Sequence, residues 1–188
     1  VATLDTKGLE LGFLRDNIRA KGCETIVLDP GIMGRPQIEA DIPREDVAHS
    51  AGTTLDELTS KATHSSDRMQ LIQIMIEGAT RIIERLYTEG RLDGIISIGG
   101  SMGMAIGSAC MKALPVGVPK LMVGTHFYPQ HLGENNLTIM QSPTDIMGLN
   151  PVTNMILLQA SSAICAMAGE KADIHKSRPL VALTGLGV

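Results

Sequence analysis

The sequence predicts an α/β protein of the Rossmann-like type, a three-layer sandwich in which helices cover both faces of an open, mainly parallel sheet. Short runs of aliphatic and β-branched residues alternate with longer amphipathic segments, which is the pattern of parallel strands joined by crossover helices. Several of these runs end in glycine and small polar residues, as strands beside a binding site do. With 2% aromatic residues and no Trp, the core must be aliphatic, with the 11 Met residues as its fillers.

The start of the chain is typical of one strand–helix–strand unit. Val1 to Leu4 is predicted to be a short strand, followed by a turn over residues 5–8. Leu9 to Ala20 has apolar residues at helical spacing, and Gly22 is a typical residue after a helix end. Thr25 to Leu28 is a second β-branched run, which we expect to be the next strand.

Two charged residues of this unit are candidates for ligand contacts. Lys7 lies in the predicted turn with Thr6 and Gly8, where its ammonium group can reach a phosphate. Asp29 ends the second predicted strand, as does the acid that accepts from ribose hydroxyls in dinucleotide-binding folds. The sequence has no GxGxxG motif, so a true dinucleotide site is not expected. The alternative is that Asp29 only shapes the Pro30-Gly31 turn.

A long polar connection follows this unit, and then the clearest helix of the chain. Short helices are expected to begin near Pro43 and Thr54, and His49 and His64 are expected at the surface. A polar connection of this length usually carries function or covers a site. Asp67 to Glu89 has a continuous apolar stripe at helical spacing, so we predict one long amphipathic helix there.

The centre of the chain holds the stretch around which we expect the fold to be organised. Leu92 to Ile98 is apolar enough for a buried strand, and Met104 to Ala113 has the composition of a helix packed on the sheet. The turn between them holds four small residues: Gly99, Gly100, Ser101 and Gly103. Free amides at the start of the helix would face an anion, for which phosphate is the best candidate. The alternative is a tight connection that binds nothing.

A further buried strand is expected over residues 119–123, and it ends in Gly124-Thr125. Right-handed crossovers place the carboxyl ends of parallel strands at one edge of the sheet, so the turns after these strands should converge. The converging residues form the predicted ligand site: Thr6, Lys7, Gly8, Asp29, Gly99, Gly100, Ser101, Gly103, Gly124 and Thr125.

The loop from His126 to Asn136 is polar and aromatic. We expect it to lie over the ligand edge of the sheet or against a partner subunit. The spacing of His126, His131 and Glu134 matches no standard metal site, so no metal is predicted.

The last third of the chain continues the same architecture. Leu137 to Met140 is expected to be a strand, and Asn150 to Ala168 is a helix. This helix is so apolar that it should be buried on most sides, either under a further domain or in a homo-oligomer. We therefore expect one Rossmann-like subdomain over residues 1–170. Residues 171–188 would be a linker and the first strand of a second, truncated subdomain.

Composition argues against several classes of protein. A net charge of −4 does not suit unspecific nucleic-acid binding. Cys23, Cys110 and Cys165 have no metal-ligand spacing, and we expect reduced, buried thiols of a cytoplasmic protein. The apolar run from Met155 to Ala168 is too short to span a bilayer. Both ends fall next to or inside predicted strands, so we expect a piece of a longer protein.

Five parts of the sequence carry a resemblance to a known family. They are Val1 to Gly8, Gly90 to Gly94 leading into Gly99 to Ser101, Ala113 to Val123, Asp145 to Asn150, and Leu183 to Val188. They resemble the ATP-binding domain family that includes the tomato inhibitor of tomato mosaic virus replication, together with its bacterial and fungal relatives. The resemblance runs in order over essentially the whole chain.

The resemblance implies a two-subdomain α/β protein of about twice this length, of which this chain is the first subdomain. It also implies ATP binding. The family's glycine turn corresponds to the turn from Gly99 to Gly103, and its first loop corresponds to Thr6, Lys7 and Gly8. The sequence departs from the family after Gly124-Thr125, where His126-Phe127-Tyr128-Pro129 replaces the small residues of the relatives.

The leading hypothesis is therefore a cytoplasmic domain that binds ATP, with or without Mg²⁺. The sequence has no GxxxxGK[ST] motif, so efficient ATP hydrolysis is not implied. A second hypothesis is an enzyme for a small phosphorylated or carboxylated metabolite, with His126, His131 or Asp145 as acid or base. A third is a protein-interaction module, homo-oligomeric, in which a nucleotide has only a structural role.

Overall fold

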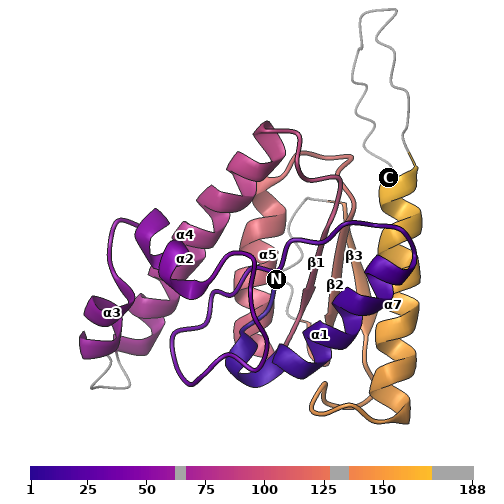
Figure 1. Ribbon diagram of the computed structural model, residues 1–188, viewed down its shortest axis with the longest axis horizontal. Coiled ribbons are helices and arrows are strands. Elements are labelled where there is room, and N and C mark those ends of the chain that lie inside the picture. The colour runs from indigo at the N-terminus through magenta and orange to yellow at the C-terminus, as the bar shows by residue number, and fades with distance from the viewer. Residues whose placement is uncertain (62–66, 128–135, 171–188) are drawn as a thin grey trace, which may run out of the picture.

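The structure is a computed structural model that describes residues 1–61, 67–127 and 136–170. Its middle layer is a sheet of three strands, β1 (Ile95–Ile98), β2 (Lys120–Gly124) and β3 (Leu137–Gln141) (Figure 1). The strand order is β1-β2-β3 and both pairs are parallel, so the carboxyl ends of the three strands lie at the same edge. The predicted α/β fold, with an open parallel sheet and helices on both sides, is confirmed.

Helices cover the two faces of this sheet as separate layers (Figure 1). On one face lie α1 (Leu4–Ala20) and α7 (Pro151–Gly169), which pack against each other. On the other face lie α4 (Asp67–Thr88) and α5 (Ser101–Ala113), which also form a pair. Each strand contributes side chains to the packing on both faces, since alternate side chains of a strand point to opposite faces.

The alternation along β1 and β2 separates two hydrophobic clusters. Ile98, Leu121 and Val123 are buried with residues of α1 and α7. Ile95 and Met122 are buried with residues of α4 and α5. Both clusters are aliphatic, as the composition predicted, and the buried Met residues of the two belong to the cluster on the α4 and α5 side.

Two short helices lie outside α4. They are α2 (Arg44–Ser50) and α3 (Leu55–Lys61), as the sequence predicted. Thr54 begins α3 with a reciprocal pair of bonds, because its Oγ1 accepts from the Glu57 amide (3.2 Å) while Glu57 Oε2 accepts from the Thr54 amide (3.4 Å). α2 packs close to α4 at Gly78, where a Cβ atom would lie 2.1 Å from the Val47 carbonyl oxygen.

The predicted strand from Val1 to Leu4 is wrong, and so is the turn after it. The chain is extended only up to Thr3, and helix α1 begins at Leu4. Val1 still lies along β1, since its amino group donates to the Ile96 carbonyl (2.8 Å) and its carbonyl accepts from the Ile98 amide (3.3 Å). Two hydrogen bonds are too few to make this segment a further strand of the sheet. The kink of α1 falls at Lys7, which has φ −127° and ψ 17°.

The predicted strand from Thr25 to Leu28 is also wrong. Only Leu28 makes a strand-like contact, a single parallel bridge to Ile42. The Val27 amide donates instead to the carboxylate of Asp41 (2.7 Å), so a side chain takes the place of a neighbouring strand. A run of β-branched residues in the sequence does not indicate which groups will accept hydrogen bonds from its backbone amides.

The remaining predicted elements are confirmed with shifted ends. β1 is shorter than predicted, and α5 begins three residues earlier, at Ser101, so Ser101 and Gly103 are helical residues. α7 begins at Pro151 after a capping box, in which Asn150 Oδ1 accepts from the amides of Val152 and Thr153. The predicted linker and strand over residues 171–188, and His64 and His131, lie outside the described residues.

By length and composition alone, α7 is one helix among the described residues that could cross a membrane. Its buried residues are Ile156, Leu157, Ala160, Ser161 and Ile164, together with Thr153 in the first turn. Packing on α1 and β2 accounts for this apolar face in the way that it does for the core helix of a globular domain. The opposite face exposes Met155 (53%) and Leu158 (40%), so α7 is not buried on most sides within the described chain.

Candidate functional site

The turn between β1 and α5 has the geometry of an anion cradle. Gly100 is the N-cap residue of α5, and its carbonyl accepts from the Met104 amide (2.9 Å). No side chain of the described residues caps this helix start. The first amides of a helix have no partner within the helix, so the amides of Ser101, Met102 and Gly103 point out of its amino end. Such amides, at the positive end of the helix dipole, attract anions.

At three glycines of the predicted site, packing leaves little room for a side chain. A Cβ atom at Gly99 would lie 3.0 Å from the Cα of Gly103, and one at Gly103 would lie 3.2 Å from the Ile98 carbonyl oxygen. A Cβ atom at Gly124 would lie 2.9 Å from the Met104 sulfur and 3.0 Å from the Gly99 carbonyl oxygen. These glycines let β1, β2 and α5 meet closely, whether or not a ligand binds.

Gly100 differs from its neighbours because the space beside it is open. A Cβ atom there would have no neighbouring atom within 4 Å. The residue lines a hollow of about 550 Å³, which is within the usual range for small-molecule sites. Among the described residues, its lining is Gly100, Thr125, His126, Gln141, Ser142, Pro143, Thr144 and Asp145. The hollow therefore lies where β1, β2 and β3 all end, as the rule for parallel sheets predicts.

Polar bonds hold the walls of this hollow in place. The Ser142 amide donates to the Gly124 carbonyl (2.8 Å), and the Ser142 hydroxyl donates to the Thr144 carbonyl (2.6 Å). On the opposite wall, His126 Nδ1 and Thr125 Oγ1 are 3.0 Å apart. Ser142 is buried, whereas His126 and Asp145 are exposed to solvent and free to meet a ligand.

Lys7 lies directly behind this hollow. The residue is 8% exposed, and its ammonium group donates to the carbonyl of Ile146, the residue after the lining residue Asp145. On the next turn of α1, Glu10 is 3% exposed and its Oε1 accepts from the Gly148 amide (2.5 Å). Two charged side chains of α1 thus hold the loop that leads from the hollow to α7. An ammonium group has three donors, so Lys7 has further capacity for an acceptor.

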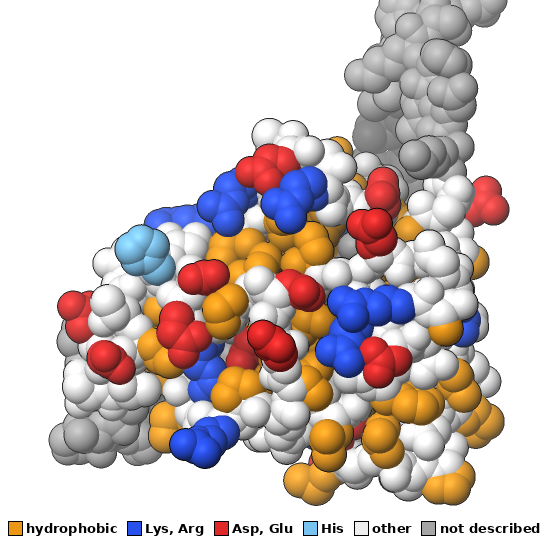
Figure 2. Space-filling model, in the orientation of Figure 1, with side chains coloured by type: hydrophobic (Ala, Val, Ile, Leu, Met, Phe, Trp, Pro, Cys, Tyr) orange, Lys and Arg blue, Asp and Glu red, His pale blue; other side chains and the backbone are white. Residues whose placement is uncertain are grey.

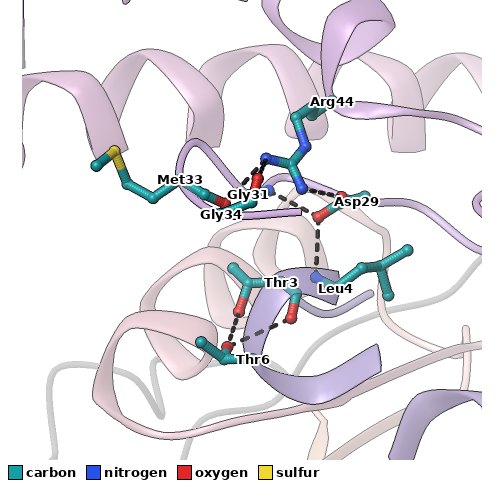
Figure 3. Close-up of polar contacts among 8 residues, drawn as sticks. All are labelled: Thr3, Leu4, Thr6, Asp29, Gly31, Met33, Gly34 and Arg44. Carbon is teal, nitrogen blue, oxygen red and sulfur yellow. Dashed lines mark hydrogen bonds and ion pairs between the residues drawn. The ribbon is translucent and has the colours of Figure 1, made fainter. Parts of the chain in front are cut away.

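Asp29 is a buried part of the framework (Figure 3). Its Oδ1 accepts from the amides of Leu4 (3.1 Å) and Gly31 (2.9 Å), and its Oδ2 lies 3.3 Å from Arg44 Nη2. The Arg44 guanidinium also donates to the carbonyls of Met33 (2.9 Å) and Gly34 (3.0 Å). Asp29 is 1% exposed and Arg44 is 4% exposed, so this ion pair ties the long polar connection to the start of α1.

The other residues of the first predicted loop have mixed surroundings. Thr6 is exposed, and its hydroxyl is 3.0 Å from that of Thr3. Gly8 is buried, and a Cβ atom there would lie 2.7 Å from Gln37 Cβ. The structure therefore brings together Gly100 and Thr125 at the hollow, with Lys7 behind it. It places Asp29 in a separate buried cluster.

Sequence reasoning missed most of the third wall of the hollow, which consists of Gln141 to Thr144. The same rule about strand ends applies to β3, and the polar sequence after residue 140 was the signal that could have found it. No group of three metal-ligating side chains occurs among the described residues. His131 and Glu134, whose spacing from His126 matches no standard metal site, lie outside the described residues.

Comparison with known proteins identifies the family of this chain. Residues 1–173 match the description "Uncharacterised protein family (UPF0261) N-terminal domain". A UPF0261 protein of Clostridium tetani is 38% identical over 192 residues, covering 100% of this chain and 46% of the relative. A UPF0261 protein of Brucella suis is 33% identical over 191 residues, covering 100% of this chain and 45% of the relative.

A plant relative is more distant. The ToMV susceptible protein tm-1(GCR26) of Solanum lycopersicum is 26% identical over 194 residues, covering 96% of this chain and 26% of that protein. The kinship indicated by the sequence is thereby confirmed, while ATP binding stays a prediction. The chain spans about half the length of the bacterial relatives it matches.

Proposed function

The chain belongs to the UPF0261 family as its N-terminal domain, and from this premise we propose that it is the nucleotide-binding part of a longer protein, with ATP as its ligand. The observation that carries the proposal is the hollow of about 550 Å³ at the carboxyl edge of the sheet, onto which Gly100 opens. Helix α5 starts at this hollow with uncapped amides. The resemblance to an ATP-binding family points to the same turn.

In this proposal the phosphates lie against the amides of Ser101, Met102 and Gly103. Backbone amides suit phosphate oxygens because they offer several donors with no side chain in the way. The Thr125 hydroxyl is on the opposite wall of the same hollow. Among the described residues of the lining, Asp145 is the acidic one, and its carboxylate would attract Mg²⁺ bound to the phosphates.

Lys7 would supply the remaining positive charge. Its ammonium group already lies behind Asp145, through its bond to the Ile146 carbonyl. A phosphate in the hollow would give this buried cation an anionic partner that the described residues do not provide, since Ile146 offers a neutral oxygen. Asp29 is engaged by two amides and by Arg44, so the proposal does not need it at the ribose.

Gly100 offers a direct test, because a side chain there has room. We propose isothermal titration of the protein with ATP, ADP and a panel of sugar phosphates, with and without Mg²⁺. Gly100→Asp places a negative charge in the cradle, and Gly100→Asn is its neutral control of the same shape. Both residues are favourable at an N-cap, so neither should reduce thermal stability. We expect the Asp variant to lose ATP binding and the Asn variant to keep more of it.

Equal ATP affinity of the wild type and the Asp variant would refute the cradle. Absence of ATP binding to the wild type would refute the choice of ligand. If a sugar phosphate bound in place of ATP and the Asp variant did not bind it, the result would support the anion site and identify its ligand as a small metabolite.

A second candidate function is catalysis on a small phosphorylated or carboxylated metabolite. His126 and Asp145 line the same hollow as Gly100, and this observation favours it. An imidazole and a carboxylate beside an anion cradle can act as acid and base. Its test is turnover of whichever sugar phosphate binds. His126→Asn and Asp145→Asn should each abolish turnover while binding persists.

We also propose that the protein works in the cytoplasm as a homo-oligomer. The apolar side chains Met147 (72%), Leu149 (45%), Met155 (53%) and Leu158 (40%) are exposed on α7 and on the loop before it. Clustered exposed apolar residues are typical of interaction surfaces. Light scattering on the eluting protein should give a mass above 20.0 kDa, and Leu158→Glu should lower it to that of the monomer. A monomeric mass for the wild type would contradict this.

A further inference from the structure

A second hollow lies at the opposite edge of the sheet, where the strands begin. Its volume is about 720 Å³, and its lining comes from the end of α1, the segment after it, the end of α4 and the end of α7. Figure 2 shows hydrophobic side chains at the floor of this part of the surface, with charged side chains around them. None of the ten residues of the predicted ligand site belongs to its lining.

Two cysteines from distant parts of the chain line this hollow together. Cys23 follows the end of α1, and Cys165 lies near the end of α7. Both contact the same carbonyl oxygen of Ile18, which lies 3.4 Å from the Cys23 amide nitrogen and 4.0 Å from Cys165 Sγ. Both cysteines also pack against the same hydrophobic cluster between α1 and α7. All three cysteines are free, as expected, but the expectation of buried thiols is wrong for Cys23 and Cys165.

Exposure distinguishes these two thiols from the third. Cys23 and Cys165 are half-buried at the wall of an open hollow, whereas Cys110 is fully buried in α5. Burial and the hydrogen bond from Cys23 raise the pKa of the Cys165 thiol to about 11. Cys165 is thus held as a neutral thiol beside its partner, and it must lose its proton before its sulfur can attack a mixed disulfide on Cys23.

We propose that Cys23 and Cys165 are a redox-active thiol pair that forms an intramolecular disulfide with a small disulfide oxidant such as oxidised glutathione. The Cys23 thiolate attacks the oxidant, and one glutathione thiolate leaves. The Cys165 sulfur then attacks the mixed disulfide, so the Cys23–Cys165 bond forms and the second glutathione leaves. The two protein protons end on the two glutathione thiols, and the protein loses the two electrons that the oxidant gains.

The bond would join the two helices of one layer at the end away from the proposed ligand site. At the other end of the same layer, α1 already holds the loop before α7 through Lys7 and Glu10. Oxidation would therefore fasten α1 to α7 at both ends. It would also join two of the segments that line the second hollow.

The test is equilibration of the reduced protein with glutathione, from a large excess of the reduced form to a large excess of the oxidised form. Acid quenching and alkylation are followed by mass measurement of the intact protein and of its unreduced peptides. We expect two thiols to disappear together, with a single peptide pair joining Cys23 to Cys165, while Cys110 stays free. The Cys165→Ser variant should stop at a mixed disulfide on Cys23.

Three results would overturn the proposal. They are a pair that stays reduced in the most oxidising mixture, a separate glutathione on each thiol of the wild type, and a bond that joins two chains. Cys110→Ala is the control for a thiol outside the pair, and it should leave disulfide formation unchanged. Because the decisive observation is made on the wild type, poor folding of a variant does not affect it. The result is also independent of whether ATP binds at the other edge.

Discussion

Replacing Gly107 by alanine should push α5 away from the sheet. Gly107 is buried in the middle of α5, opposite Ser97 of β1. A Cβ atom at this position would lie 2.3 Å from Ser97 Oγ and 2.6 Å from Ser97 Cβ. An ordinary contact is 3.4–4 Å, so the helix and strand must separate by the better part of an ångström. The Ser97 Cβ is fixed to the backbone of β1, so it cannot turn aside.

Two opposing effects set the size of the loss. Overpacking of a close helix–sheet contact costs about 1–3 kcal/mol. Removing a glycine from the interior of a helix contributes about 1 kcal/mol in the other direction. Because the clash is with a fixed atom, we take the upper part of the first range, which leaves a net loss of about 2 kcal/mol. For a chain of this size, that corresponds to a fall in Tm of about 4–8 °C.

The assay is thermal unfolding followed by circular dichroism, with two matched variants. Gly169→Ala makes the same change at the end of α7, where a Cβ atom would have no neighbour within 4 Å, so it should leave Tm nearly unchanged. In a Ser97→Gly background the clash is removed, so Gly107→Ala should cost little there. A Gly107→Ala protein as stable as the wild type, or an equal loss in both backgrounds, would refute the reasoning.

Two further predictions concern the packing of α2 and the buried ion pair. Gly78→Ala should lower the free energy of unfolding by about 2 kcal/mol, because the new Cβ would lie 2.1 Å from the Val47 carbonyl oxygen and α2 must move. Denaturant titration measures this loss. Gln73→Ala, on the exposed face of α4, is the control. Arg44→Met should cost about 3–5 kcal/mol, since Asp29 would be left buried without its ion-pair partner. The cost should fall markedly in an Asp29→Asn background, and equal costs in both backgrounds would show that the ion pair contributes nothing.

Local patterns were enough to predict most of the fold. The stripe of apolar residues in α4 and the glycine that ends it are properties of adjacent sequence, and the same holds for the apolar run of β1. The first strand was predicted wrongly because helix α1 starts early, where the Leu4 amide is bound by Asp29 from 25 positions away. The periodicity of apolar residues cannot indicate a contact between residues so far apart in the sequence.

The candidate site divides in the same way. Gly100 and Thr125 could be predicted to meet, because strand order and handedness follow general rules. The burial of Asp29 against Arg44 could not, since it depends on how a long irregular connection folds back. The contact of Cys23 with Cys165 was equally hidden, because their separation in sequence says nothing about the packing of α1 on α7.

The pairing of Val1 with β1 has a consequence for the order of folding. Neighbouring strands of the sheet are connected by short crossovers, whereas the Val1 amino group meets a carbonyl 95 residues away. The entropy of loop closure delays contacts between distant residues, so we expect the parallel strands to assemble first and the amino-terminal segment to dock late. If the segment docks late, an Ala2→Gly variant should unfold faster than the wild type while its folding rate is unchanged. Slower folding of the variant would show that the segment docks early.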